Sequence, residues 1–131
     1  MKHPRRLRFG LKFRTAKDGA ALAEMARRAE AIGYSTILVS DHPTHPQLGP
    51  LTAATALACA TTRLRVGSSV LANDFRHPIV LAKEIATLDR LCGGRVELGL
   101  GTGWKKAEYE AMGLEFDAAS RRIERLREAI A

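Results

Sequence analysis

The feature that most constrains the fold of this chain is a repeated order of apolar strand, polar cluster and helix. Three predicted strands each run into polar or glycine residues and then into a helix-like stretch. They are Ser35–Ser40 before Asp41-His42, Leu64–Ala72 before Asn73-Asp74, and Arg95–Leu100 before Gly101–Trp104. In parallel α/β folds the carboxyl ends of the strands meet at one rim, where ligands bind. The three polar clusters are therefore predicted to face one common site.

The rest of the chain extends the same pattern to four units. Leu7–Phe13 alternates apolar with basic or glycine residues and predicts a first strand. Helices are predicted over residues 18–32, 51–62, 78–91 and 105–112, with a last helix after Asp117; Asp18 and Asp117 are the predicted N-caps. The βαβαβαβα order fits repeated right-handed crossover units. Two architectures remain open, a doubly wound open sheet and the first half of an eightfold barrel, which typically needs about 250 residues.

Length and composition indicate one ordinary domain. The chain has 131 residues, of which 46% are apolar, enough to fill a core. No apolar run reaches the roughly 18 residues that span a bilayer, and the N-terminus has no pattern typical of a signal peptide. Cys59 and Cys92 lie in apolar helical patterns and are predicted to be buried thiols. We therefore expect a cytoplasmic protein with no membrane partner.

The positive charge is concentrated at the N-terminus. The net charge is +7, and residues 1–17 hold seven Lys and Arg residues and no acidic residue, while the remainder is neutral. A uniform nucleic-acid-binding face is therefore not indicated. Most of this segment is interpreted as a solvated terminus, but Arg14 follows the first strand and is predicted to lie near the rim.

Several short motifs in the right order resemble one enzyme family. They are Ala31-Ile32-Gly33-Tyr34, Ser40-Asp41-His42, Arg63–Gly67, His77-Pro78, Leu88–Leu91 with Gly93-Gly94-Arg95, and Leu98–Trp104. Over nearly the whole chain they resemble the N-terminal half of the bacterial-luciferase-like monooxygenases, TIM-barrel enzymes that use flavin or the deazaflavin coenzyme F420. The resemblance implies that residues 1–131 form roughly the first four β/α units of a (β/α)8 barrel.

The deazaflavin branch is the nearer one. Ser40-Asp41-His42 and Phe75-Arg76 are similar to its members, whereas the luciferase branch often has Glu before the histidine and a reactive Cys at the position of Gly101. The resemblance implies F420, with FMN as the alternative, and hydride transfer or oxygenation of a small organic substrate. Some deazaflavin sugar dehydrogenases carry a proposed acidic Glu where this chain has Trp104.

The same resemblance implies a role for individual residues. In the family, a bulge with a non-proline cis peptide supports the ring of the cofactor, and the matching pair here is Ser69-Val70. His42 would act catalytically by passing a proton. The implied cofactor-binding residues are Asp41, Ser69, Val70, Gly101, Thr102 and Gly103, and Trp104 would contact the substrate. From the residues alone, a cap for Asp41, a structural role for His42 and a packing role for Trp104 fit equally well. No spacing of His, Cys, Asp and Glu indicates a metal site.

Two alternatives remain open. Glu97 and the glycines that follow resemble the loop of S-adenosylmethionine-dependent methyltransferases, although such a loop normally follows the first strand of its domain. A chain of this length also lacks the later loops that usually bind cofactor phosphate in a TIM barrel. It could therefore be a truncated, non-catalytic half-barrel that assembles into oligomers. A homo-oligomer is expected for a half-barrel, whether catalytic or truncated, because it leaves strand edges unpaired.

Overall fold

The computed structural model describes residues 7–131 and has the parallel α/β architecture that the sequence predicts. The main sheet contains β1 (Gly10–Phe13), β2 (Thr36–Val39), β3 (Arg65–Ser68) and β5 (Val96–Glu97), parallel and in that order. A second parallel pair, β4 (Leu71–Ala72) with β6 (Leu100–Gly101), continues β3 and β5. The basic residues Lys2, Arg5 and Arg6 lie outside the described residues.

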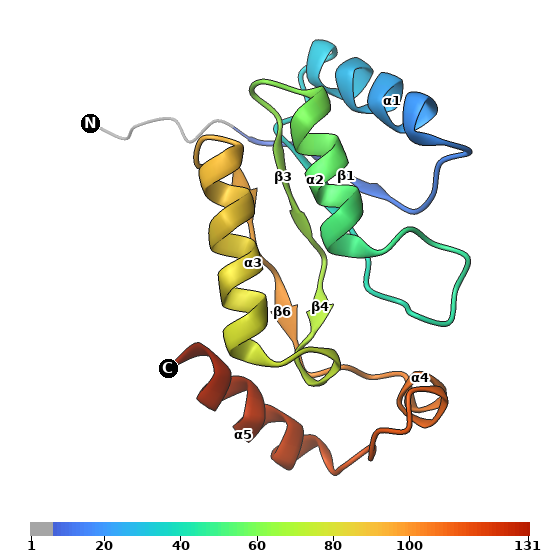
Figure 1. Ribbon diagram of the computed structural model, residues 1–131, viewed down its shortest axis with the longest axis vertical. Coiled ribbons are helices and arrows are strands. Elements are labelled where there is room, and N and C mark those ends of the chain that lie inside the picture. Colours follow the sequence, from blue (N-terminus) through green and yellow to red (C-terminus); the bar gives the residue numbers. More distant parts are fainter. Residues whose placement is uncertain (1–6) are drawn as a thin grey trace.

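The helices are α1 (Gly19–Ala31), α2 (Pro50–Ala60), α3 (Pro78–Leu91), α4 (Lys106–Ala111) and α5 (Ala119–Ile130), with a short 3-10 turn, η1 (Asn73–Phe75). Figure 1 shows α2 and α3 in front of the strands, and α4 and α5 at the end of the molecule toward which β4 and β6 run. In residues 7–131 we find no helix with the length and apolar character needed to cross a membrane.

The core lies between the sheet and helices α1 to α3. Ile37 and Val39 alternate along β2 and are fully buried, as is Val66 on β3. They pack with the apolar faces of the helices, including Leu22 and Leu57. This layer explains the near-continuous apolar character of the middle strands, because helices cover the sheet where these side chains point.

The predicted strand Leu64–Ala72 is interrupted in its middle. The peptide between Ser69 and Val70 is cis, and it separates β3 from β4, so the expectation of a cis peptide or a bulge at this pair is confirmed. Gly67 lies directly against the backbone of Glu97 on β5, where a Cβ atom would collide with the neighbouring carbonyl group. Glycine is therefore required at this point for the two strands to approach.

Two local predictions were wrong. Asp18 caps α1, with Ala21 donating to its carboxylate, but the N-cap of α5 is Ala118 and not Asp117. The carboxylate of Asp117 instead accepts from Arg125, about two turns into the helix. Cys59 is exposed, because it lies on the outer side of α2, whereas Cys92 is buried as expected. An apolar pattern in a helix does not by itself fix which face is covered.

Polar side chains secure the opposite end of the sheet from the rim. The Arg95 guanidinium donates to five acceptors around the ends of α2 and α3, among them the carbonyls of Ala58, Thr61 and Cys92. Glu30 accepts from three successive backbone N–H groups before β3. Burial alone would raise the pKa of Glu30, but these backbone donors together lower it below its ordinary value. Both residues satisfy backbone groups that the helices and strands leave open.

Candidate functional site

The polar strand ends converge on one cavity. Its volume is about 150 Å³, and it lies where the strands end at their carboxyl side. Six of the eight predicted site residues line it: Asp41, His42, Ser69, Val70, Gly103 and Trp104. Gly101 and Thr102 belong to the same rim but are not part of the cavity wall. Segments more than 60 residues apart in sequence therefore meet at one site, as predicted for the polar clusters that begin at Asp41 and Gly101. The third cluster, Asn73-Asp74, was predicted to face the same site but lines a different cavity.

The Ser69-Val70 segment forms one wall of the cavity. The Val70 side chain is 47% exposed, although the strands on either side of it are buried. Gly101 faces it so closely that an added Cβ atom would lie 2.8 Å from Val70 Cγ2, and one at Gly99 would lie 2.9 Å from Val70 Cγ1. The glycines after β5 thus leave room for an apolar side chain that projects into open space.

Asp41 is held by the segment that leads into α3. Its carboxylate is almost completely buried and accepts two hydrogen bonds from Arg76, at 2.5 and 2.9 Å. The backbone N–H of Ala72 donates to the same carboxylate at 3.0 Å. Bidentate pairing of this kind is strong and directional. Asp41 therefore links the ends of β2 and β4 to the start of α3.

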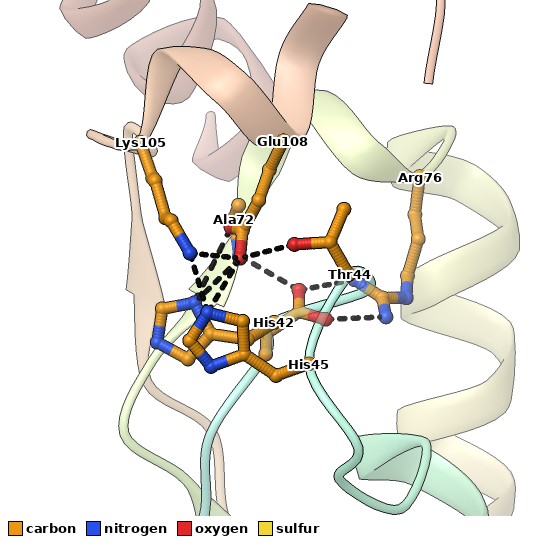
Figure 2. A network of polar contacts seen from close by, with 8 residues as sticks. His42, Thr44, His45, Ala72, Arg76, Lys105 and Glu108 are labelled. Carbon is orange, nitrogen blue, oxygen red and sulfur yellow. Dashed lines mark hydrogen bonds and ion pairs between the residues drawn. The ribbon is translucent and has the colours of Figure 1, made fainter. Parts of the chain in front are cut away.

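His42 belongs to a second polar network, drawn in Figure 2. Its Nδ1 atom lies 3.0 Å from Oε1 of Glu108, a carboxylate of α4 that is only 2% exposed. Thr44 donates to the same oxygen at 3.3 Å, and the ammonium of Lys105 lies 3.5 Å away. The ring of His45 stacks on His42 with 4.9 Å between centroids and also accepts from Lys105. Glu108 is therefore the centre of this network.

The glycine-rich turn after β6 is fixed by Tyr109. The hydroxyl of this buried residue lies 2.9 Å from the carbonyl oxygen of Thr102 and 3.1 Å from Asp74 Oδ2. Burial and the neighbouring charge of Asp74 raise the pKa of Tyr109 to about 12, so the hydroxyl keeps its proton. Gly103 has a φ of +74° and presses against the Tyr109 ring. The turn is thus held by its backbone, while Trp104 beyond it is 73% exposed.

Sequence reasoning missed part of the site. Glu108, Lys12, Ala72 and Phe75 also line the cavity, whereas Arg14, the basic residue expected near the rim, is exposed and does not line it. His45, interpreted as a surface residue, is exposed but stacks on His42. Alternation along the first strand offered a signal for Lys12, since it shares a face with Gly10. Glu108 offered none, because acidic residues are common on short helices.

A larger cavity, of about 650 Å³, lies between η1, the start of α3 and α5. Its main charged groups are already paired, because Arg125 donates to both Asp74 and Asp117. None of the predicted site residues lines it. In residues 7–131 there is no group of three His, Cys, Asp or Glu side chains that could hold a metal ion.

Comparison with known proteins assigns the family. The sequence profile of the luciferase-like monooxygenases matches residues 8–131. An F420-dependent glucose-6-phosphate dehydrogenase of Kribbella flavida is 38% identical over 132 residues, which covers 95% of this chain and 40% of the relative. The 5,10-methylenetetrahydromethanopterin reductase of Methanopyrus kandleri is 33% identical over 109 residues, covering 82% of this chain and 30% of the relative.

Solved structures agree with the fold. The F420-dependent tetrahydromethanopterin reductase of Methanopyrus kandleri superposes with a TM-score of 0.74 at 30% identity, covering 84% of this chain and 31% of that chain. A long-chain alkane monooxygenase superposes with a TM-score of 0.86 at 15% identity, which shows the fold alone. This chain spans about 40% of the length of the first curated relatives that it matches. Its parallel α/β fold corresponds to part of their TIM barrel, and the chain belongs to the luciferase-like monooxygenase family.

Proposed function

We propose that residues 1–131 form the N-terminal half of a TIM-barrel oxidoreductase that binds coenzyme F420 at the carboxyl ends of its strands. The observation that carries this proposal is the meeting of Ser69-Val70, His42 and Trp104 at one cavity. The F420-dependent names of the relatives support the deazaflavin, and FMN is the alternative. When bound, such a cofactor supplies or accepts a hydride in a reaction with a small organic substrate.

The residues present fit one side of a planar ring. Val70 offers an apolar surface that is half exposed in the cavity, and Gly99 and Gly101 leave the room that its side chain occupies. Oδ2 of Asp41 already accepts from both Arg76 and Ala72, but Oδ1 accepts from Arg76 alone and retains a lone pair, so Asp41 can still accept from a ring edge through Oδ1. The volume of about 150 Å³ is below the roughly 300–1,000 Å³ of typical ligand pockets. These residues therefore supply one wall of the proposed site.

His42 and Trp104 are the proposed reacting and substrate-contacting groups. Histidine exchanges protons near neutral pH, and the ring of His42 lines the cavity. Trp104 meets it edge-on at 6.2 Å between centroids and offers an exposed aromatic surface. Because sugar dehydrogenases of the deazaflavin branch carry a proposed acid at the position of Trp104, we propose a small organic substrate without assigning it to the sugar phosphates.

Calorimetric titration of the purified protein with F420, FMN and S-adenosylmethionine tests this function. We expect saturable binding of F420 and weaker binding of FMN. Val70→Asp should lower the F420 affinity at least about tenfold, because it places a charge against the apolar face of the ring. Val80→Asp is the matched control: Val80 is similarly exposed but lies on α3, outside the cavity, and this change should leave the affinity unaltered. Binding of S-adenosylmethionine with no affinity for either ring cofactor would favour the methyltransferase alternative.

A further inference from the structure

The contact between His42 and Glu108 joins two elements that are far apart in sequence. His42 follows β2, and Glu108 lies on α4, 66 residues later. The Nδ1 atom of His42 is within hydrogen-bonding distance of both carboxylate oxygens, at 3.0 and 3.3 Å. The other ring nitrogen, Nε2, has no hydrogen-bond partner among residues 7–131. One edge of the imidazole is therefore committed to Glu108, and the other is available.

The charge of Glu108 is balanced by a different residue. A buried carboxylate is costly unless a cation and hydrogen bonds compensate it. Lys105, one turn earlier, places its ammonium 3.5 Å from Glu108 Oε1, and Thr44 adds a hydroxyl donor. His42 therefore does not have to be protonated to stabilise this carboxylate. A neutral imidazole can satisfy Glu108 by donating its Nδ1–H alone.

Two aromatic neighbours hold the ring in place. His45 stacks on His42 at an interplanar angle of 23°, and Trp104 meets it at 84°. His45 accepts from Lys105, the same cation that compensates Glu108. The stacking limits rotation of the imidazole, while the carboxylate selects which nitrogen carries the proton. When one nitrogen of a histidine is bound to an acceptor, the tautomer is set by that bond.

We propose that Glu108 is a positioning residue that holds neutral His42 in the Nδ1–H tautomer, so that Nε2 is presented as a proton acceptor at the cavity. This inference rests on the proposed function for the use of that acceptor. It assigns to α4 a role in preparing the reacting group, and it explains why a carboxylate is almost completely buried there. An orienting acceptor behind a catalytic imidazole is a recurring arrangement in enzymes.

The tautomer can be measured directly by long-range ¹H–¹⁵N correlation spectroscopy of the ¹⁵N-labelled chain, at alkaline pH where the imidazoles are neutral. In the wild-type protein we expect Nδ1 of His42 to give a protonated-type shift and Nε2 an unprotonated-type shift. Glu108→Ala should cause loss of the Nδ1–H tautomer as the major form. His77 is the internal control, because its exposed ring makes no capping bond, and its pattern should not change.

Thr44→Val is the matched control variant. It removes the other uncharged donor to Glu108 while leaving the carboxylate in place, so His42 should remain in the Nδ1–H form. An Nε2–H tautomer in the wild-type spectrum would overturn the inference even if Glu108→Ala failed to fold. An unchanged tautomer in a folded Glu108→Ala protein would also overturn it. A protein with the expected tautomers that binds neither F420 nor FMN would contradict the proposed function and leave the role of Glu108 intact.

Discussion

The guanidinium of Arg76 binds both carboxylate oxygens of Asp41, at 2.5 and 2.9 Å, across the rim of the sheet. The side chain of Asp41 is 1% exposed and that of Arg76 is 23% exposed, so the pair is screened from solvent on the carboxylate side. Asp41 also accepts from the backbone of Ala72 in β4. Asp41 therefore joins the end of β2 to β4 through Ala72 and to the segment before α3 through Arg76.

Removing the cation of this pair should be more damaging than removing an exposed arginine. Arg76→Ala leaves a buried carboxylate without its partner and should lower the free energy of unfolding by about 3–5 kcal/mol. Arg121→Ala, on the exposed side of α5, should change it by less than about 0.5 kcal/mol. Chemical denaturation of the two variants measures the difference. Equal stabilities would show that the Asp41–Arg76 pair does not hold the rim.

Two glycines with the same backbone conformation allow the effect of backbone strain to be distinguished from that of a steric clash. Gly103 and Gly113 have φ values of +74° and +71°, so alanine is strained at both. At Gly103 the new Cβ would also lie 2.9 Å from two ring carbons of Tyr109, whereas the space at Gly113 is open. We expect Gly103→Ala to destabilise the protein by about 1–3 kcal/mol more than Gly113→Ala. Thermal unfolding of both variants checks this, and similar losses would contradict the close packing of the turn on Tyr109.

The Asp74–Arg125 pair should make the free energy of unfolding depend on pH in the acidic range. Burial alone would raise the pKa of Asp74, but hydrogen bonds from Arg125 and Tyr109 lower it below its ordinary value. A carboxylate with a lowered folded-state pKa stabilises the fold above its unfolded pKa of about 3.9, and this stabilisation is lost as the pH falls through the folded-state value. Chemical denaturation at several pH values below about 4 measures how the free energy of unfolding changes with pH. This dependence should be weaker for Asp74→Asn than for the wild-type protein. Glu115→Gln, an exposed control, should retain the wild-type slope. Identical slopes for wild type and Asp74→Asn would show that this pair contributes nothing to the acid response.

The chain should associate with itself. Within residues 7–131, β1 and β5 are the edges of the main sheet, and large apolar side chains such as Val70, Leu98 and Ile123 are 41–51% exposed. Unpaired strand edges and exposed apolar surface favour contact between copies. Sedimentation analysis should show dimers or larger species whose proportion rises with concentration. A sharp monomer with cooperative unfolding would count against this prediction.

The order of the elements was predictable because it depends on local patterns. Helix α3, for example, has the bounds that its proline and paired glycines indicate. The position of the Ser69-Val70 wall followed from the family resemblance, since nothing in the serine and valine side chains requires a cis peptide.

The polar partners were not predictable in the same way. Glu108 and Arg76 act on residues 66 and 35 positions away, and only the folded chain brings them together. Aspartate is a favoured N-cap residue, but the side chain of Asp117 pairs with Arg125 and does not cap α5. Ile123 and Ile130 of α5 illustrate the same limit: their spacing is typical of an apolar helix face, but they are 51% and 65% exposed.

The most direct test of the proposed site is a titration of the ¹⁵N-labelled protein with F420, followed residue by residue in amide spectra. A ring against the cavity wall predicts saturable shift changes that are largest at Ser69, Val70, Gly103 and Trp104. Amides around Glu30 and Arg95, at the opposite end of the sheet, should stay in place. Saturable changes centred on that opposite end, or no saturable change at the cavity residues, would contradict the claim that these strand ends bind the cofactor.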